Sequence, residues 1–180
     1  MAERMLPWPQ LPDVVAAQLA AIAAEDEEPE EGEDAPAGVD PETGEVIPRL
    51  VRPWDLSALT ADLEEAVWSW LDDAVMWLNY AYGWQDEQVI PPCWPEHPGL
   101  ALDLAALAFG RLDAYETSTA AYVGRWHSDW DDFQRRMTAA LGDSRRDCLR
   151  DKHTRPGGYT VDAVREVINR GRAKAAKKGA

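Results

Sequence analysis

Residues 60–83 read TADLEEAVWSWLDDAVMWLNYAYG, and the spacing of apolar side chains in this stretch decides the fold. At about 100° per residue, the apolar side chains share one side of a helix and most of the carboxylates share the other. Thr60 is placed to cap the helix and Gly83 to end it. The stretch therefore predicts a helix over residues 61–82 with one buried face, formed by Leu63, Val67, Trp70, Leu71, Ala74, Val75, Trp77, Leu78 and Ala81.

Two later stretches have the same helical spacing. One helix is expected to start at about Pro98 and end at about Glu116, and the next to run from about Thr119 to Leu141. The prolines between Trp84 and Pro98 predict an extended loop before the first of them. The apolar stripes are Leu100, Leu104, Leu107, Ala108, Leu112 and Tyr115 on the first helix, and Tyr122, Val123, Trp126, Trp130, Phe133, Met137 and Leu141 on the second.

Leu102 and Phe109 lie opposite the main apolar stripe of the helix that starts at about Pro98. A long apolar side chain left in water forgoes about 1.5–3 kcal/mol, so both need a cover. We expect that cover to be either an N-terminal helix or a second protomer.

Shorter helices are expected at both ends of the chain. Asp13 can cap a helix over residues 13–24, and Thr160 can cap one that carries Val161, Val164, Val167 and Ile168. No stretch alternates with a period of two residues. The fold class is therefore all-α, a small helical bundle of three long helices with short terminal helices.

The chain divides into four parts by composition. Residues 1–24 hold the short helix, residues 25–49 an acidic, proline-containing linker, residues 50–158 a tryptophan-rich domain, and residues 159–180 a basic arm. The linker has too little apolar surface to offset the entropy of ordering it, so we expect it to be disordered.

Eight of the nine tryptophans lie between Trp54 and Trp130. Large aromatic side chains are more often core than ligand box. Trp94 is the exception, because Cys93 and Pro95 flank it in a loop. We expect a partner-binding or loop surface at Trp94, Leu102 and Phe109.

The charge is unevenly divided: the whole chain carries −15, residues 1–133 carry 5 Lys and Arg against 28 Asp and Glu, and residues 134–180 carry 13 against 5. A basic arm of this kind has the electrostatics of a phosphate-contacting segment, although it also suits solubility or docking to a protein. The candidate contacts to nucleic acid or to a partner are Arg165, Arg170, Arg172, Lys174, Lys177 and Lys178.

Composition excludes some classes of protein. No apolar run approaches the roughly 18 residues of a membrane-spanning helix, so we expect no membrane partner. Two cysteines 55 positions apart do not form a disulfide framework, and no secretory leader is convincing. A cytoplasmic protein with reduced thiols is the expectation.

Both cysteines and all three histidines fall between residues 93 and 153, in the order Cys93-x3-His97, His127, Cys148-x4-His153. Zinc binds thiolate and imidazole ligands, four of them in a closed tetrahedral site. The candidate metal ligands are Cys93, His97, His127 and Cys148, and His127 is expected to point inward. The alternative is a core histidine with two buried structural thiols, since these spacings match no standard zinc finger.

Catalytic motifs are absent from the sequence. It has no glycine-rich phosphate loop, no Gly-x-Ser-x-Gly elbow and no His-Glu-x-x-His. The one candidate is His127 with Asp131 one helical turn later, or with Cys93 or Cys148 across the fold, and any exposed His/Asp pair with this spacing would look the same. We therefore assign no catalytic residue, and a metal-dependent enzyme ranks third among the functional interpretations.

One set of residues has a familiar combination: Arg52-Pro53-Trp54, Leu59-Thr60, Trp77-Leu78, Tyr82, the block Ile90-Pro91-Pro92-Cys93-Trp94-Pro95-Glu96-His97-Pro98, Tyr115 and Trp126-His127. This set resembles an uncharacterised family of small actinobacterial proteins found on conjugative plasmids, integrative elements and phages. The resemblance covers about residues 50 to 150. It implies an accessory gene of a mobile element and supplies no activity, cofactor or catalytic residue.

The leading interpretation is therefore a non-enzymatic accessory protein of a mobile genetic element that acts through protein–protein interaction. The alternative is a weak, sequence-independent DNA-binding accessory or regulator that contacts duplex DNA through its basic arm.

Overall fold

The computed structural model describes residues 5–27, 49–117, 119–150 and 152 of the 180-residue chain. Within these ranges the protein is all-α and has no strand, as the sequence predicts. None of the described helices is both long enough and apolar enough to cross a membrane. The elements in chain order are α1 (Asp13–Glu27), α2 (Ala61–Tyr82), η1 (Trp94–Glu96), α3 (Pro98–Glu116), α4 (Ala120–Leu141), η2 (Gly142–Ser144) and α5 (Arg145–Cys148).

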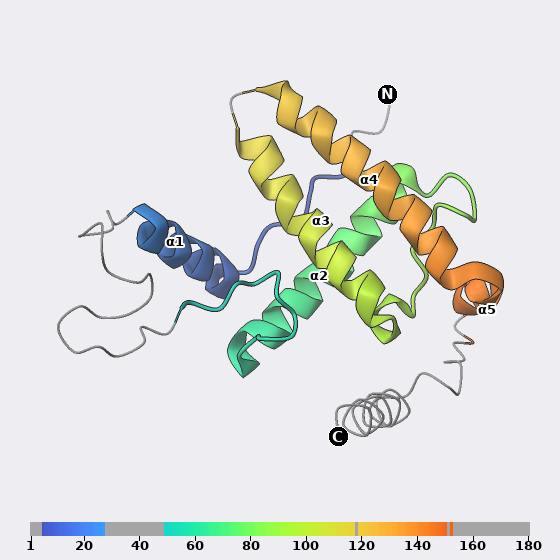
Figure 1. Ribbon diagram of the computed structural model, residues 1–180, viewed down its shortest axis with the longest axis horizontal. Helices are drawn as coiled ribbons and strands as arrows, with labels where there is room; N and C mark the ends of the chain where they lie inside the picture. The colour runs from blue at the N-terminus through green and yellow to red at the C-terminus, as the bar shows by residue number, and fades with distance from the viewer. Residues whose placement is uncertain (1–4, 28–48, 118, 151, 153–180) are drawn as a thin grey trace, which may run out of the picture.

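The helices α3 and α4 form an antiparallel hairpin, and α2 crosses it (Figure 1). The turn between α3 and α4 closes one end of the hairpin. At the open end, the start of α3 comes close to α5, the short helix that follows α4. The helix α1 packs against α2 rather than against the hairpin. This arrangement brings segments from the middle and the end of the sequence together at the open end.

The core confirms the helical periodicity of the sequence. The helix α2 has the predicted bounds, and its predicted inward side chains are buried except for the half-buried Ala81. Trp70, Leu104 and Trp130, one from each long helix, are all buried in a single core. On α4, the stripe from Trp126 to Leu141 is buried, whereas Tyr122 at its start is exposed.

Of the three side chains expected at a partner-binding surface, two are buried and one is exposed. Trp94 is only 2% exposed because its ring stacks on Trp68, so the prediction of a surface residue is wrong for it. Phe109 is also buried, in contact with Trp54 and Trp70. Its cover thus comes from this chain, from the segment before α2 and from α2 itself, and neither of the two predicted covers is needed.

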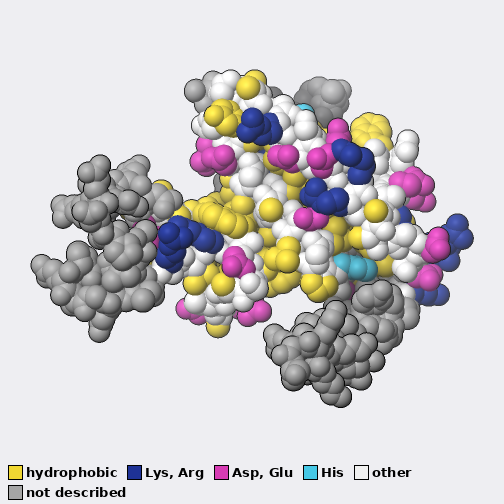
Figure 2. All heavy atoms as spheres, viewed as in Figure 1, with side chains coloured by type: hydrophobic (Ala, Val, Ile, Leu, Met, Phe, Trp, Pro, Cys, Tyr) yellow, Lys and Arg dark blue, Asp and Glu magenta, His cyan; other side chains and the backbone are white. Residues whose placement is uncertain are grey.

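Leu102 is 47% exposed and remains a surface residue. Figure 2 shows hydrophobic side chains gathered along the flank of α3, while charged side chains of both signs lie over the hairpin. On that charged surface, Arg136 pairs with Asp103 of α3 at 2.9 Å and Arg135 pairs with Asp132.

An N-terminal strap, residues 5–12, packs on the core although its sequence shows no helical pattern. The indole of Trp77 donates a hydrogen bond to the carbonyl of Leu6 at 2.8 Å, and that of Trp70 donates to the carbonyl of Pro9 at 3.3 Å. Between them, Trp8 meets both indoles edge to face. The strap therefore uses tryptophan N–H groups to satisfy its own carbonyls.

The helix α1 extends to Glu27, three residues beyond the predicted end, so the predicted linker does not begin at residue 25. Two side-chain contacts join α1 to the segment before α2. Gln18 donates to the carbonyl of Val51 at 2.7 Å, and Arg52 pairs with Glu25 at 3.3 Å. The remainder of the linker, the predicted helix after Thr160 and the six candidate residues of the basic arm lie outside the described residues.

Candidate functional site

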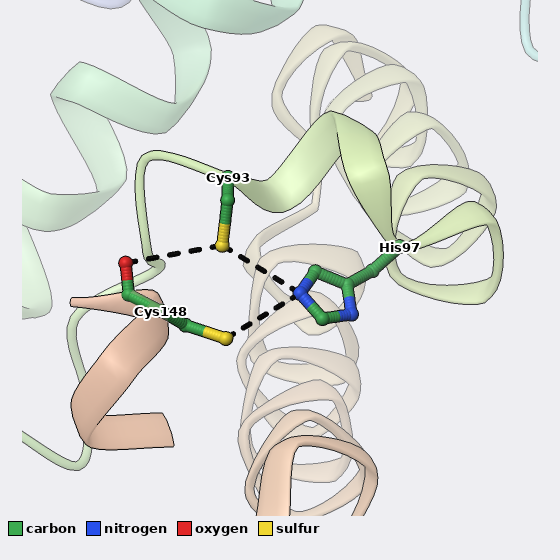
Figure 3. Close-up of side chains that lie close together, drawn as sticks. All are labelled: Cys93, His97 and Cys148. Atoms are coloured by element: carbon green, nitrogen blue, oxygen red, sulfur yellow. Dashed lines mark hydrogen bonds between the residues drawn. The ribbon is translucent and has the colours of Figure 1, made fainter. Parts of the chain in front are cut away.

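Three of the four predicted metal ligands meet at the open end of the hairpin: Cys93, His97 and Cys148 (Figure 3). The Nε2 atom of His97 lies 3.6 Å from the Sγ of Cys93 and 3.6 Å from the Sγ of Cys148. All three ligand atoms lie within 4.8 Å of one another. Both sulfurs are buried, at 4% and 1% exposure for the two cysteines, and the histidine is half-buried.

The local sequence explains the positions of Cys93 and His97. Cys93 immediately precedes η1, a 3-10 helix of one turn. His97 immediately follows η1 and occupies the N-cap position of α3. Pro98 at the first position of α3 fits because that position needs no N–H donor. One short turn thus places two ligands four residues apart on the same side of the chain.

Trp94 anchors this turn to α2. Its ring stacks on Trp68, and its indole N–H donates to a carboxylate oxygen of Asp72 at 3.2 Å. A buried indole needs such a partner for its N–H. The residue between the two ligands therefore fixes the turn and does not contact a partner.

The loop before the turn is held from two sides. Asn79 of α2 brackets Ile90, accepting from its N–H at 2.8 Å and donating to its carbonyl at 3.0 Å. Arg145 of α5 donates to the carbonyls of Asp86 and Val89, each at 2.8 Å. Because Arg145 lies one turn before Cys148, the same residue that holds the loop also positions the third ligand.

Burial lowers the pKa of the Arg145 guanidinium below its ordinary value, and the nearby carboxylates of Glu87 and Asp86 oppose that shift. An arginine remains charged at neutral pH under such conditions. Its N–H groups are therefore permanent donors to the loop carbonyls. The contact between α5 and the loop therefore does not depend on a titrating group.

The fourth predicted ligand, His127, does not join the cluster. It is exposed on α4, so the expectation that it points inward is wrong, and its Nε2 lies 3.5 Å from the hydroxyl of Tyr82. Trp126 and Trp130 take the inward positions of this part of α4. His153 lies outside the described residues.

A donor set of two thiols and one imidazole suits borderline or soft metal ions and does not suit the hard cations that prefer oxygen. Within the described ranges, it is the one group of three or more Cys, His, Asp or Glu side chains whose ligand atoms converge. The site is therefore a candidate metal centre.

A second feature, not anticipated from the sequence, is a set of exposed large hydrophobic side chains at and just after the C-terminal end of α2. Met76, Tyr80 and Trp84 are all largely exposed, and their spacing of four residues places Met76 and Tyr80 on one side of the helix. We call it the Met76–Tyr80–Trp84 face. The sequence signal for it was the position of Trp84 after Gly83, where the helix and its buried stripe have already ended.

Comparison of the chain with protein-family models, with curated proteins and with solved structures finds no match.

Proposed function

We propose that the protein acts by binding a partner protein through the Met76–Tyr80–Trp84 face rather than by catalysis. The observation that carries this proposal is Trp84, whose side chain is 85% exposed. Its indole N–H donates to the carbonyl of Ala81 at 3.0 Å, so the ring is held in place although it lies in solvent. A preorganised aromatic ring loses little conformational freedom on binding, and tryptophan is enriched among the residues that dominate binding energy.

The charge around this face indicates which side chains a partner needs. Between Arg52 and Arg111 the sequence holds ten Asp and Glu residues and no Lys or Arg. Three of these carboxylates, Glu65, Asp72 and Asp73, are exposed on α2 on the N-terminal side of Met76. On the other side of the face, Asp86 and Glu87 are partly balanced by Arg145. The occupant that fits is a partner segment with apolar side chains for the face and Lys or Arg for the α2 carboxylates.

A peptide-display selection on the immobilised protein tests this proposal. We expect the enriched peptides to combine Lys or Arg with large apolar residues, and to lose at least about tenfold in affinity for a Trp84→Ala variant. Tyr122→Ala is the matched control, because Tyr122 is an exposed aromatic residue on α4, far along the chain from this face. Enrichment of acidic peptides, or peptides that bind the Trp84→Ala variant as tightly as the wild type, would contradict the proposal.

The resemblance to proteins of actinobacterial mobile elements supports a wider context for this activity. In that context the protein is an accessory factor whose partner belongs to the element or to its host. The block at residues 93–98 is a specific part of the resemblance, and in the fold it forms the turn that contains two of the clustered ligands. Co-purification of the tagged protein from cells with and without the element tests the context, since an element-encoded partner disappears with the element.

A second candidate function is contact with nucleic acid, favoured by the excess of eight positive charges after residue 133. If six basic side chains of the arm contact duplex phosphates, the logarithm of affinity should fall with the logarithm of salt at a slope near −5. Binding should be weak and independent of sequence. A titration of duplex DNA at several salt concentrations tests this. Failure to retain duplex at about 50 mM salt removes the candidate.

A further inference from the structure

We propose that Cys93, His97 and Cys148 bind a Zn²⁺ ion, which joins the turn before α3 to α5 at the open end of the α3–α4 hairpin. The three ligand atoms come from the turn before α3 and from α5 after α4, and they converge on one small volume (Figure 3). This inference is independent of the Met76–Tyr80–Trp84 face, which lies on another element.

The distances between the ligand atoms fit zinc. Bonds of about 2.3 Å to sulfur and about 2.0–2.1 Å to nitrogen, at tetrahedral angles, place sulfur and nitrogen about 3.5–3.6 Å apart. Both measured distances from Nε2 of His97 to the two sulfurs are 3.6 Å. The same geometry places two sulfurs about 3.8 Å apart, within the 4.8 Å that encloses all three atoms.

Hydrogen bonding explains part of this convergence, because the Sγ of Cys93 also donates to the carbonyl of Cys148 at 3.8 Å, but it does not explain why two sulfurs approach one nitrogen (Figure 3). The Nε2 atom of an imidazole has either one proton or one lone pair, so it serves one sulfur well and not two. Here two sulfurs approach the same nitrogen at equal distance. A shared ion between the three atoms uses the nitrogen lone pair once and satisfies both sulfurs together.

Charge balance also favours a divalent ion. Two thiolates and one neutral imidazole carry two negative charges, which Zn²⁺ neutralises. A neutral complex avoids the cost of burying a net charge, and both cysteines are buried. Zinc needs no change of oxidation state and accepts mixed sulfur and nitrogen ligands, with a fourth ligand completing the tetrahedron.

The contacts around the cluster hold its ligands in position, as a metal centre requires. The loop is bracketed by Asn79, the turn is anchored by Trp94, and α5 is tied to the loop by Arg145. Such surrounding contacts orient the ligands before the metal arrives. Because the ligands come from two segments that the whole α3–α4 hairpin separates along the chain, their meeting is a property of the fold and not of one flexible segment.

The direct test is the metal content of the full chain, purified without chelator from cells grown with added zinc. We expect about one zinc per chain by elemental mass spectrometry. Replacing zinc with Co²⁺ should give a thiolate-to-cobalt charge-transfer band and the intense ligand-field bands of a tetrahedral site. Both signals should be lost in His97→Ala and in Cys148→Ser. The matched control is His127→Ala, which should keep both, because His127 is an exposed histidine outside the cluster.

A measurement on the wild type keeps the test valid if a ligand variant fails to fold. Protein stripped by a chelator should take up zinc in a competition titration with a Kd below about 1 µM, and its melting temperature should rise by at least about 5 °C. The proposal is overturned if the wild type holds no zinc as purified and takes up none in the titration. It is also overturned if His127→Ala loses metal to the same extent as His97→Ala.

Discussion

The Nε2 atom of His97 lies 3.6 Å from the Sγ of Cys148, although 51 residues separate the two along the chain. Those residues form the whole of the α3–α4 hairpin. The unfolded chain rarely brings side chains this far apart in sequence together, because closing a long loop costs conformational entropy. An ion that needs both side chains therefore binds the folded chain in preference to the unfolded one.

Zinc should stabilise the fold because it binds the folded chain in preference to the unfolded one. Free zinc at about 1,000 times its Kd adds about 4 kcal/mol to the unfolding free energy, an upper figure if the unfolded chain also binds the metal. Urea unfolding of the wild type with zinc and with a chelator should differ by an amount of this order. Cys148→Ser should show no difference between the two conditions, whereas His127→Ala should respond like the wild type. Equal unfolding curves for the wild type in both conditions would contradict the proposed stabilisation by zinc.

Arg145→Ala should weaken zinc binding through the loop that Arg145 holds. Its guanidinium holds the carbonyls of Asp86 and Val89 and so fixes the loop that leads to Cys93. Loss of a contact that orients a metal ligand typically costs about 10–100-fold in affinity. The neighbouring Arg146 is exposed, and Arg146→Ala serves as the control that leaves affinity unchanged. A competition titration of both variants distinguishes orientation of the loop from a general effect of positive charge.

Trp130→Ala should cost about 3–5 kcal/mol of unfolding free energy, because the ring is buried against Phe133 and Tyr82 and leaves a cavity when removed. Trp84→Ala should cost no more than about 0.5 kcal/mol, because its ring lies in solvent. Urea melts of the two variants compare one buried and one exposed tryptophan in the same chain. A loss below about 1 kcal/mol for Trp130→Ala would contradict the packing described above.

The periodicity of the sequence predicts the helices well, because each buried stripe depends on side chains a few residues apart. The inward side chains of α2 and the cluster of Trp70, Leu104 and Trp130 follow from that spacing alone. The burial of Trp94 and Phe109 does not follow from that spacing. Each is buried by an aromatic ring from another segment, Trp68 for the first and Trp54 for the second, and no local pattern encodes such a pairing.

The candidate metal centre was predictable in part. Spacing brought Cys93 and His97 together, since four residues span a single tight turn. Selecting among the three histidines required knowledge of where the chain after α4 returns. That return is set by Arg145 and its hold on the loop, a long-range contact between a side chain and backbone carbonyls. The rotational position of His127 on α4 was misleading, because two tryptophans filled the inward positions beside it.

Arg111 is the second buried arginine, and its surroundings contain no described carboxylate partner. Its guanidinium lies over the rings of Tyr115 at 4.0 Å, Trp8 at 4.2 Å and Trp77 at 4.7 Å. Burial lowers its pKa, and the neighbouring Tyr115 opposes the shift. Two effects of similar size therefore compete. Contacts with the aromatic faces stabilise the cation by about 0.5–2 kcal/mol each, and removal from water costs several kcal/mol.

Because these effects nearly cancel, Arg111→Met should change the unfolding free energy by less than about 1 kcal/mol, since methionine fills much of the same space without a charge. Arg111→Ala should cost about 2–4 kcal/mol, because it leaves a cavity under Trp8 and loosens the N-terminal strap. Urea melts measure both, and protease cleavage before residue 13 reports the strap separately. If Arg111→Met proves as destabilising as Arg111→Ala, the charge itself and not the filled space holds the strap on the core.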